Sequence, residues 1–370
     1  MDNKDKKKIL ILCPYPYDQA AGQRLKYEQY IERWEKDNFK VTLSPYMNNS
    51  LWEVAYLKGH YFKKILGVLN GHLQRLRDLF RIKEFDIVYI FHWTTPFGTH
   101  LYDFLVRKLS KRLIFDLEDF VTLSREEEGM ERNKTISLLR SKKKAKYLIQ
   151  NADHVISSSV ELNNFCLNLN KNRQATFISS SVDTDRFLPE NLYTNDRVIT
   201  LGWTGTFSHL ANLEFLKSIL IELNKNCKFK LKLITNFNFE IKGVDCDLVF
   251  WSKEKEVEDL QDIDIGLYPL KDNAWSLGKS GLKAIQYMAF GIPTVASNIG
   301  SSSHIISHLQ NGWLVNTEEE WLEALETLIR DPSLRRSLGI EARKTVEKSY
   351  SLNAIEHQYL KILNTQINDK

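Results

Sequence analysis

A glycine-bearing loop within residues 264–297 combines the residue types needed to bind an anion. The segment fits a strand, a polar loop with Gly278 and Gly281, a helix and a second strand. A glycine loop that enters a helix exposes backbone N–H groups and the positive end of the helix dipole, which together favour a phosphate group. Lys279 and Lys283 would add full positive charges beside these groups. The spacing therefore predicts a phosphate site, and solvation of a helix face by the two lysines stays open as the alternative.

Alternating strands and helices must position this loop. Short apolar runs alternate with helix-length amphipathic stretches, which is the pattern of a parallel sheet covered by helices on both faces. In the first half the expected strands are Lys8–Cys13, Lys40–Leu43, Asp86–Phe91, Arg112–Phe115, His154–Ser157 and Thr176–Ile178. In the second half they are Val198–Gly202, Lys230–Thr235, Leu248–Trp251, Asp264–Tyr268 and Thr294–Ser297. Because a new strand, glycine turn and helix begin near Val198, the pattern predicts two Rossmann-like units.

The length of the chain also favours two domains. Its 370 residues exceed what one ordinary hydrophobic core holds. We place an N-terminal Rossmann-like domain at residues 1–188 and a C-terminal one at residues 189–352. The segment 182–196 contains Pro189 and several Asn and Asp residues, which indicates a linker. A last helix, within residues 353–370, is expected to pack back on the first domain.

Composition excludes several classes of protein. With 43% hydrophobic and 26% charged residues, the chain is unlike disordered sequences. Its apolar runs are far shorter than the ~20 residues of a membrane span, and no secretory signal precedes the first strand, so we expect a cytoplasmic protein. The four cysteines lack metal-ligand or disulfide spacing. The net charge of +4 arises in the first half, which suits an anionic partner or a merely soluble surface.

Four short motifs follow one another along the chain. They are Ala152-Asp153-His154-Val155-Ile156, the segment from Val182 to Pro189, Gln286-Tyr287-Met288-Ala289-Phe290-Gly291-Ile292-Pro293, and Asn311-Gly312-Trp313-Leu314-Val315. In this order they resemble the signatures of glycosyltransferase family 4, over nearly the whole chain. The resemblance implies an α/β protein of the GT-B type, in which two Rossmann-like domains face each other across a cleft. It also implies transfer of a sugar from a nucleotide-diphosphate sugar with retention of the anomeric configuration.

The two donor-binding glutamates of that family are absent from this sequence. Gly278 and Gln286 stand at the matching positions. The pattern W-S-x-G-K-S-G-L-K-x-x-Q-Y-M-A-x-G-I-P is similar to a subgroup in which Lys and Gln occupy this helix. In family members the second glutamate holds the nucleotide ribose, and the amide of Gln286 can still hydrogen-bond a diol. The first glutamate holds the donor hexose, a role that Gly278 cannot take over.

Lysines of the glycine loop replace cations that many relatives carry after the first strand of the second domain. That position holds Gly205 and Thr206 here, with no Lys or Arg before Lys217. A buried diphosphate without cations would be costly. We therefore assign its neutralisation to Lys279 and Lys283. Gly205 and Thr206 are expected to add backbone or hydroxyl contacts to the phosphates.

The nucleobase is assigned to the end of another strand. Trp251 and Ser252 are expected to flank the base, although Trp251 could equally be a packing residue. The resulting donor-binding candidates are Gly22, Gly205, Thr206, Trp251, Ser252, Gly278, Lys279, Ser280, Gly281, Lys283 and Gln286.

Two polar segments of the first domain are assigned to the acceptor. Gly22 lets the backbone approach a ligand, and Arg24 could hold an acceptor phosphate or acidic sugar, or be a surface residue of the first helical turn. The string from Phe115 to Phe120 resembles the D-x-D-D stretch of the same subgroup, which implies that Glu118 and Asp119 face the acceptor hydroxyl. Metal ligation by this string is an open alternative, but the expectation is a metal-independent protein without a cofactor. The acceptor-binding candidates are Arg24 and Glu118, and the catalytic candidates are Glu118, Asp119, Lys279 and Lys283.

Residues 56–80 form an amphipathic stretch with a basic rim. Its large apolar residues share one helical face, and lysines and arginines surround them. A second basic cluster follows at Lys142, Lys143, Lys144 and Lys146. The stretch could be a core helix with a solvated rim, or it could lie on an anionic membrane. Peripheral contact of the N-terminal domain with the inner face of the cell membrane therefore stays open.

The function predicted from these features is that of a retaining, hexosyltransferase-type glycosyltransferase. Its expected partners are a nucleotide-diphosphate sugar and a glycan or lipid-linked sugar acceptor, in the assembly of bacterial surface polysaccharide or lipopolysaccharide. The loss of both family glutamates leaves open a catalytically inactive sugar-nucleotide-binding subunit. An epimerase or phosphorylase of the same layout fits the motifs less well. The sequence holds no recognised nucleic-acid motif, so no nucleic-acid partner is expected.

Overall fold

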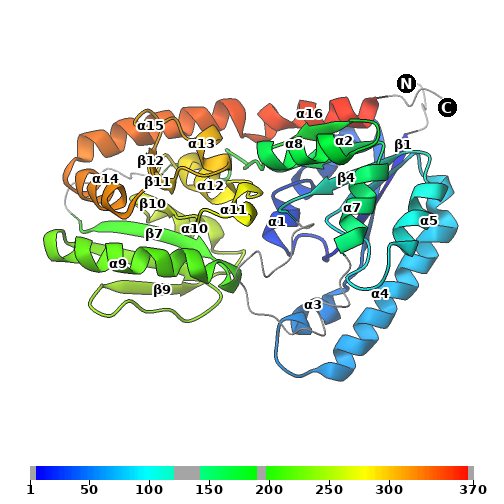
Figure 1. Ribbon diagram of the computed structural model, residues 1–370, viewed down its shortest axis with the longest axis horizontal. Helices are drawn as coiled ribbons and strands as arrows, with labels where there is room; N and C mark the ends of the chain where they lie inside the picture. Colours follow the sequence, from blue (N-terminus) through cyan, green and yellow to red (C-terminus); the bar gives the residue numbers. More distant parts are fainter. Residues whose placement is uncertain (1–5, 121–141, 190–196, 366–370) are drawn as a thin grey trace. The chain divides into compact units, whose positions relative to one another are not determined.

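Two six-stranded parallel sheets organise the residues that the structure describes, which are 6–120, 142–189 and 197–365 of this computed structural model (Figure 1). The contacts between residues divide the chain into two units. The N-terminal unit comprises Met1–Ser179, Gly278–Ser280 and Glu356–Lys370. The C-terminal unit comprises Ser180–Leu277 and Gly281–Ile355.

The sheet of the N-terminal unit has the strand order β2-β1-β3-β4-β5-β6. Its strands are β1 (Lys7–Cys13), β2 (Phe39–Pro45), β3 (Ile87–Phe91), β4 (Leu113–Leu117), β5 (His154–Ser157) and β6 (Ala175–Phe177). Its helices are α1 (Ala21–Arg24), α2 (Ile31–Lys36), α3 (Asn49–Ala55), α4 (Tyr61–Arg81), α5 (Leu101–Leu109), α7 (Lys142–Asn151) and α8 (Val160–Leu169), with short 3₁₀ turns at Glu28–Tyr30 and Ile82–Glu84. The strand order reverses between β1 and β3, and ligands of open α/β sheets bind at the carboxyl ends of the strands beside such a reversal.

Apolar strands and aromatic side chains form the core of this unit. Residues 9–13 of β1 are all buried, as expected of a parallel strand that has helices on both faces. On one face, α5, α7 and α8 pack against the sheet. An aromatic cluster also includes Tyr359 of α16 (Leu352–Asn364), whose ring centre lies 5.5 Å from that of Trp34 and 5.1 Å from that of Tyr30. The closing helix from Glu356 onward thus contributes to this core.

The sheet of the C-terminal unit has the strand order β12-β11-β10-β7-β8-β9. Its strands are β7 (Ile199–Gly205), β8 (Phe229–Thr235), β9 (Cys246–Phe250), β10 (Ile265–Tyr268), β11 (Thr294–Ser297) and β12 (Trp313–Val315). Its helices are α9 (Leu210–Asn226), α10 (Glu256–Gln261), α11 (Ala274–Leu277), α12 (Leu282–Ala289), α13 (Ser301–Ile305), α14 (Glu318–Arg330) and α15 (Pro332–Ser349), with a 3₁₀ turn at Phe207–His209. Here the order reverses between β7 and β10.

Helices cover both faces of this second sheet. α9 and α14 share one apolar cluster with β7 and β8, and α12 and α15 belong to another. Gly266 lets α12 lie close to β10, because a Cβ there would sit 2.5 Å from Cδ2 of Tyr287. Val182 and Phe187, from the segment expected to be a linker, are instead packed into the second cluster. Their burial in apolar surroundings explains why this part of the segment belongs to the C-terminal unit.

The structure tests one of the two interpretations of residues 56–80, that of a core helix with a solvated rim. The helix α4 begins only at Tyr61, after the shorter α3, and it is the long helix at the edge of the N-terminal unit in Figure 1. Its apolar stripe is exposed, with Phe62 at 75% and Phe80 at 90%, so the interpretation as a core helix is wrong for this face. The buried face carries Gly67 and Gly71 instead. Within the described ranges, no helix has both the length and the apolar character to cross a bilayer.

Candidate functional site

In the C-terminal unit the candidate site begins at the carboxyl end of β7. A Cβ on Gly205 would clash with the Trp203 ring and lie 3.0 Å from Nζ of Lys283, so no side chain fits at this position. The Lys283 ammonium lies 5.1 Å from the centre of the Trp203 ring, a cation–π distance. Thr206 is exposed, and its hydroxyl lies 2.8 Å from that of Ser208. The structure thus brings two predicted residues, Gly205 and Lys283, together where the strand order reverses.

The glycine loop leads into α12 as a phosphate site requires. Gly281 is the residue before the helix and has φ 73°, a conformation that favours glycine, and a Cβ there would clash with Ile305. The first N–H groups of α12 and the positive end of its dipole lie beside Lys283 in the first helical turn. Backbone donors and one ammonium group therefore converge at this corner of the sheet.

Gln286 lies deeper in the C-terminal unit and contacts a carboxylate that the sequence analysis did not single out. Its amide donates to Oε1 of Glu256 over 3.4 Å, and both side chains are almost fully buried. The other oxygen of Glu256 lies 3.7 Å from a guanidinium nitrogen of Arg186. Since Glu256 is on α10, the unit still has a glutamate beside the position of the missing second family glutamate, but on another helix.

The residues assigned to the base lie at the edge of the same sheet. Trp251 follows β9, which β8 separates from β7, and its N–H donates to the carbonyl of Thr235. The Trp251 side chain is 37% exposed, so it is not a core residue. Ser252 accepts a hydrogen bond from the N–H of Lys255 over 3.3 Å.

In the N-terminal unit the candidate site lies at the carboxyl ends of β1, β3 and β4. Gly22 follows β1, and a Cβ on it would lie 2.8 Å from Oε2 of Glu118, which follows β4. The two predicted residues are therefore in close contact. Arg24, on the short helix α1, is 6% exposed, which is inconsistent with the alternative of a surface residue.

A buried ion pair lies beneath Glu118. Nζ of Lys26 is 3.5 Å from Oδ1 of Asp116, and both side chains are fully buried. Lys26 also donates to the carbonyl of Ile178 over 3.1 Å, and the Tyr89 hydroxyl donates to Asp116. Burial raises the pKa of Glu118 to about 8, against the opposing effect of the Lys26 charge. A carboxyl group with such a pKa exchanges protons near neutral pH, as acid–base chemistry requires.

Asp119 and the glycine loop complete this group of residues. Nζ of Lys279 lies 3.1 Å from Oδ1 of Asp119, and both residues belong to the N-terminal unit by their contacts. In the same unit a Cβ on Gly278 would lie 2.9 Å from the backbone N of Phe120, so the position of the first family glutamate admits only glycine here. Ser280 is the last residue of the loop segment that contacts this unit.

His92 is a candidate that the sequence analysis missed. It follows β3, has φ 60°, and the N–H of Trp93 donates to the carbonyl of Phe91 across it, which makes His92 the centre of a strained γ-turn. Nδ1 of the ring is buried and has no hydrogen-bond partner among the described residues. Burial lowers the pKa of His92 to about 4, so the ring is neutral at pH 7. Its position after the strand 86–91 was the available sequence signal.

Two further features bear on the chemistry. Among residues 6–120, 142–189 and 197–365, no group of three or more His, Cys, Asp or Glu residues is arranged to hold a metal ion.

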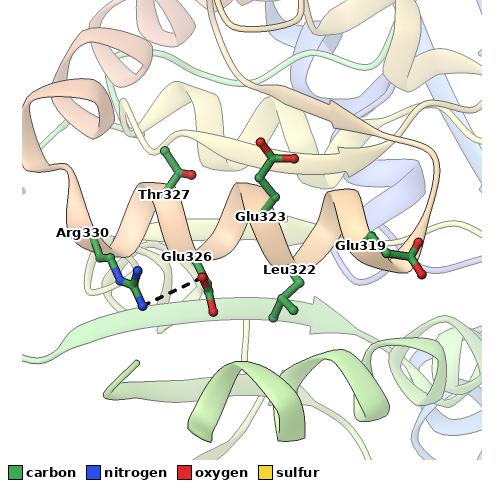
Figure 2. A pocket seen from close by; sticks show the side chains of 6 residues that line it. All are labelled: Glu319, Leu322, Glu323, Glu326, Thr327 and Arg330. Atoms are coloured by element: carbon green, nitrogen blue, oxygen red, sulfur yellow. Dashed lines mark ion pairs between the residues drawn. The ribbon is translucent and has the colours of Figure 1, made fainter. Parts of the chain in front are cut away.

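Figure 2 shows a hollow along α14, lined by Glu319, Leu322, Glu323, Glu326, Thr327 and Arg330. Arg330 lies 3.9 Å from Glu326 there. The three glutamates make this hollow unsuitable for a diphosphate, and none of the predicted site residues lines it.

Known proteins match part of the sequence. Residues 243–345 match the family model "Glycosyl transferases group 1". The Xenopus tropicalis protein "Glycosyltransferase 1 domain-containing protein 1" is 30% identical over 131 residues, which are 35% of this chain and 37% of that protein. The Staphylococcus aureus "Capsular polysaccharide biosynthesis glycosyltransferase CapM" is 23% identical over 184 residues, which are 46% and 47% of the two chains. The matches thus span less than half the length of these curated relatives.

Solved structures match nearly the whole chain in fold. Sucrose-phosphate synthase from Thermosynechococcus elongatus has a TM-score of 0.72 at 16% identity, over 97% of this chain and 98% of that one. Anabaena HepE in complex with UDP has a TM-score of 0.64 at 16% identity, over 97% and 100%. The predicted α/β fold of the GT-B type, with two Rossmann-like domains, is confirmed. Residues 243–345 of this chain are thus similar to the glycosyl transferases group 1, and the described residues have the GT-B fold.

Proposed function

We propose that this protein is a glycosyltransferase that moves a sugar from a nucleotide-diphosphate sugar to a glycan or lipid-linked acceptor. The observation that carries the proposal is the Lys283 ammonium beside Gly205, at the strand-order reversal of a unit that matches a glycosyltransferase family. HepE, which shares the fold, was solved with UDP. CapM, which shares sequence, is named for capsular polysaccharide biosynthesis. These likenesses support surface polysaccharide assembly as the pathway class.

The donor is assigned to the C-terminal unit. Its diphosphate lies against the backbone of Gly205 and Thr206 and the first turn of α12, and Lys283 supplies positive charge. Lys279 supplies a second cation when its ammonium leaves Asp119 and binds the phosphate instead. Gln286 and the neighbouring Glu256 form a pair that suits the ribose diol. Trp251 and Ser252 flank the base, and Gly278, Ser280 and Gly281 shape the loop. With these assignments we propose that the chain belongs to the subgroup in which Lys and Gln occupy this helix and both family glutamates are absent.

The acceptor is assigned to the N-terminal unit, beside Gly22, Arg24, Glu118 and Asp119. Transfer breaks the bond between the anomeric carbon and the diphosphate oxygen and forms one to the acceptor oxygen, with retention. Positive charge at the phosphates stabilises the departing diphosphate, so the reaction needs no metal. The ionised Glu118 carboxylate accepts the proton that the attacking acceptor hydroxyl loses as the new bond forms. A lipid-linked acceptor further implies a cytoplasmic protein whose N-terminal unit contacts the inner face of the cell membrane.

The experiment that tests this function combines binding and turnover. The full chain is screened for thermal stabilisation by UDP-, GDP-, ADP- and dTDP-sugars, because a ligand that binds only the folded state raises its stability. Release of nucleoside diphosphate is then measured with candidate glycan acceptors, and the anomeric configuration of the product is determined by NMR. We expect stabilisation by one nucleotide class, turnover with that class, and retention.

A second candidate, an inactive sugar-nucleotide-binding subunit, is favoured by one observation. The tight packing at Gly278 excludes any side chain there, so the contact of the family's first glutamate with the donor hexose is lost. Tight binding of a nucleotide sugar without turnover on any acceptor would select this candidate. The absence of both binding and turnover would refute the two candidates together.

A further inference from the structure

We infer that the exposed face of α4 binds an anionic lipid surface, with the helix axis parallel to the membrane plane. This inference deepens the membrane contact in the proposed function and names the surface that makes it. The six residues of the lipid-facing stripe are Phe62, Ile65, Leu69, Leu73, Leu76 and Phe80. Each is at least 51% exposed, and their spacing of three or four residues aligns them along one side of the helix.

The opposite side of α4 fixes this orientation. Gly67 and Gly71 approach the body of the N-terminal unit so closely that a Cβ would lie 2.7 Å from Leu51 or 2.6 Å from Tyr46. One turn later the buried Arg75 donates to the backbone carbonyls of Cys13, Ser44 and Thr94, at the ends of β1 and β2 and just after β3. Rotating the stripe inward would break these bonds and bury side chains where only glycine fits. The fold therefore holds the apolar stripe outward.

The charges around the stripe favour lipid over other occupants. Lys63 and Arg77 are exposed beside it, whereas the only acidic residue of the helix, Asp78, is buried between Arg75 and Arg81. An amphipathic helix with basic flanks and no exposed acid is the type that lies in an anionic interface. In a two-fold dimer through the same stripe, the basic flanks of both copies would approach each other and repel. Charge complementarity thus selects the anionic bilayer.

The neighbouring helix α5 also presents exposed apolar side chains. α5 contacts α4, and its Leu101 is 62% exposed. Phe104, one helical turn further, is 38% exposed and carries the Lys108 ammonium 5.6 Å from the centre of its ring. Two adjacent helices that both present apolar side chains with basic neighbours form a broader contact than a single helix does.

The test is co-sedimentation of the full chain with vesicles, without any nucleotide sugar. Vesicles of pure phosphatidylcholine are compared with vesicles that contain 3 parts phosphatidylglycerol to 7 parts phosphatidylcholine, at about 0.1 M salt. We expect binding to the anionic vesicles, weakened by added salt. The double variant Leu69→Asp/Leu73→Asp should lower the partition coefficient at least about 100-fold, because two apolar side chains that enter the lipid become charged. The double variant Lys63→Gln/Arg77→Gln should lower it about 30-fold on anionic vesicles alone.

The matched control changes two exposed apolar residues of the C-terminal unit, Ile221→Asp/Ile340→Asp, and should leave vesicle binding unchanged. Thermal melting confirms that each variant is folded, and the milder Phe62→Ser/Phe80→Ser replaces any that is not. Failure of the wild-type chain to bind anionic vesicles, or equal binding by the stripe variants, would overturn the inference. A wild-type dimer that Leu69→Asp/Leu73→Asp converts to monomer in sedimentation equilibrium would assign the stripe to a second copy. Either result leaves transfer to a soluble acceptor unaffected, so the proposed function is tested separately.

Discussion

The two sheets present different chemistry at the same topological position. Beside the reversal of strand order in the C-terminal unit lie glycines and the Lys283 ammonium, which is only partly buried. At the corresponding end of the sheet in the N-terminal unit lie the buried Lys26–Asp116 ion pair, Glu118 with its raised pKa, and His92 in a strained turn. The C-terminal corner resembles a preformed anion site. The N-terminal corner is a set of polar groups that the fold keeps largely out of contact with water.

This difference separates binding from chemistry. A glycine turn with a nearby ammonium stabilises an anion without any buried, unpaired charge of its own. The close packing around Gly205 and Gly281 requires glycine, but the Lys283 ammonium should be dispensable for folding. Buried carboxylates and strained backbone cost stability, and folds retain them chiefly where function requires them. The comparison therefore predicts that substitutions in the N-terminal corner change stability or catalysis, whereas substitution of Lys283 in the C-terminal corner changes donor affinity.

The largest expected effect is on the stability of the N-terminal unit. Lys26→Met removes the only cation paired with Asp116 among the described residues and leaves that carboxylate buried. Breaking a buried pair in this way costs about 3–5 kcal/mol of unfolding free energy. The measurement is urea or thermal denaturation of the variant.

The matched control for this prediction is the double variant Lys26→Met/Asp116→Leu, which removes both charges and should recover most of the lost stability. If the single variant were as stable as the wild type, the ion pair would not support Glu118. The two corners would then be more alike than we infer.

The next effect concerns catalysis at Glu118. Glu118→Gln should lower the transfer rate by about 10²–10⁴-fold, the usual contribution of a general base, while the dissociation constant of the donor stays within a few-fold. The wild-type rate should rise as pH rises through about 8, because the ionised carboxylate is the form that accepts the proton. This rise should disappear in the variant. An equal loss of donor affinity would place Glu118 in the donor site instead.

Stability measurements on the same pair of proteins provide an independent check. The pKa of Glu118 is raised in the folded state, so the folded protein binds this proton more tightly than the unfolded chain. Stability from this carboxyl is therefore present at low pH and is lost as pH rises toward about 8. The Glu118→Gln variant has no carboxyl group to ionise, so it does not lose this stability. The melting temperature of the variant should therefore exceed that of the wild type above pH 8 but not at pH 5.

A smaller effect is expected at Lys283. Lys283→Ala should lower kcat/KM for the donor by about 10–100-fold, since a cation near a diphosphate contributes roughly 1.5–3 kcal/mol. Stability should fall by no more than about 1 kcal/mol, the value of its cation–π contact with Trp203. Lys344→Ala, an exposed lysine of α15 paired with Glu341, is the matched control and should change neither quantity. Wild-type kinetics in the Lys283 variant would refute the phosphate assignment.

Much of the fold was predictable because parallel strands buried on both faces leave a plain signal. The predicted strand Lys8–Cys13 contains the continuous apolar run Ile9–Cys13, Thr294–Ser297 consists of small residues, and both lie within observed strands. The three-residue strand β12 was missed, since so short a run has no periodicity. Tyr27, Tyr30, Ile31 and Trp34 fall at helical spacing, but the regular helix α2 begins only at Ile31, after the 3₁₀ turn Glu28–Tyr30.

The site was predictable only in part, for a related reason. Gly205 ends β7 and Lys283 lies in the helix after β10, the two strands that flank the reversal of strand order. The assignment of both residues to one diphosphate already implied their proximity. The contact of Gln286 with Glu256 depends on how α10 packs against α12, which no motif encodes. The left-handed backbone of His92 is likewise a tertiary property, because histidine does not demand it.

The smallest expected effect tests whether strain at His92 serves function. At φ 60° a residue with a Cβ is strained by about 1–2 kcal/mol, whereas glycine is not. His92→Gly should therefore be more stable than His92→Ala by about 1 kcal/mol, the reverse of the usual order of these residues. Both variants should still transfer sugar more slowly than the wild type, because the neutral ring and its buried Nδ1 are gone.

The matched control is Arg173, which is exposed and also left-handed at φ 52°. There too the glycine variant should be more stable than the alanine variant, but neither should change the transfer rate. If both His92 variants kept wild-type transfer rates, the strained turn would be a feature of the fold alone, and the N-terminal corner would lose one of the groups that distinguish it from the anion receptor of the other sheet.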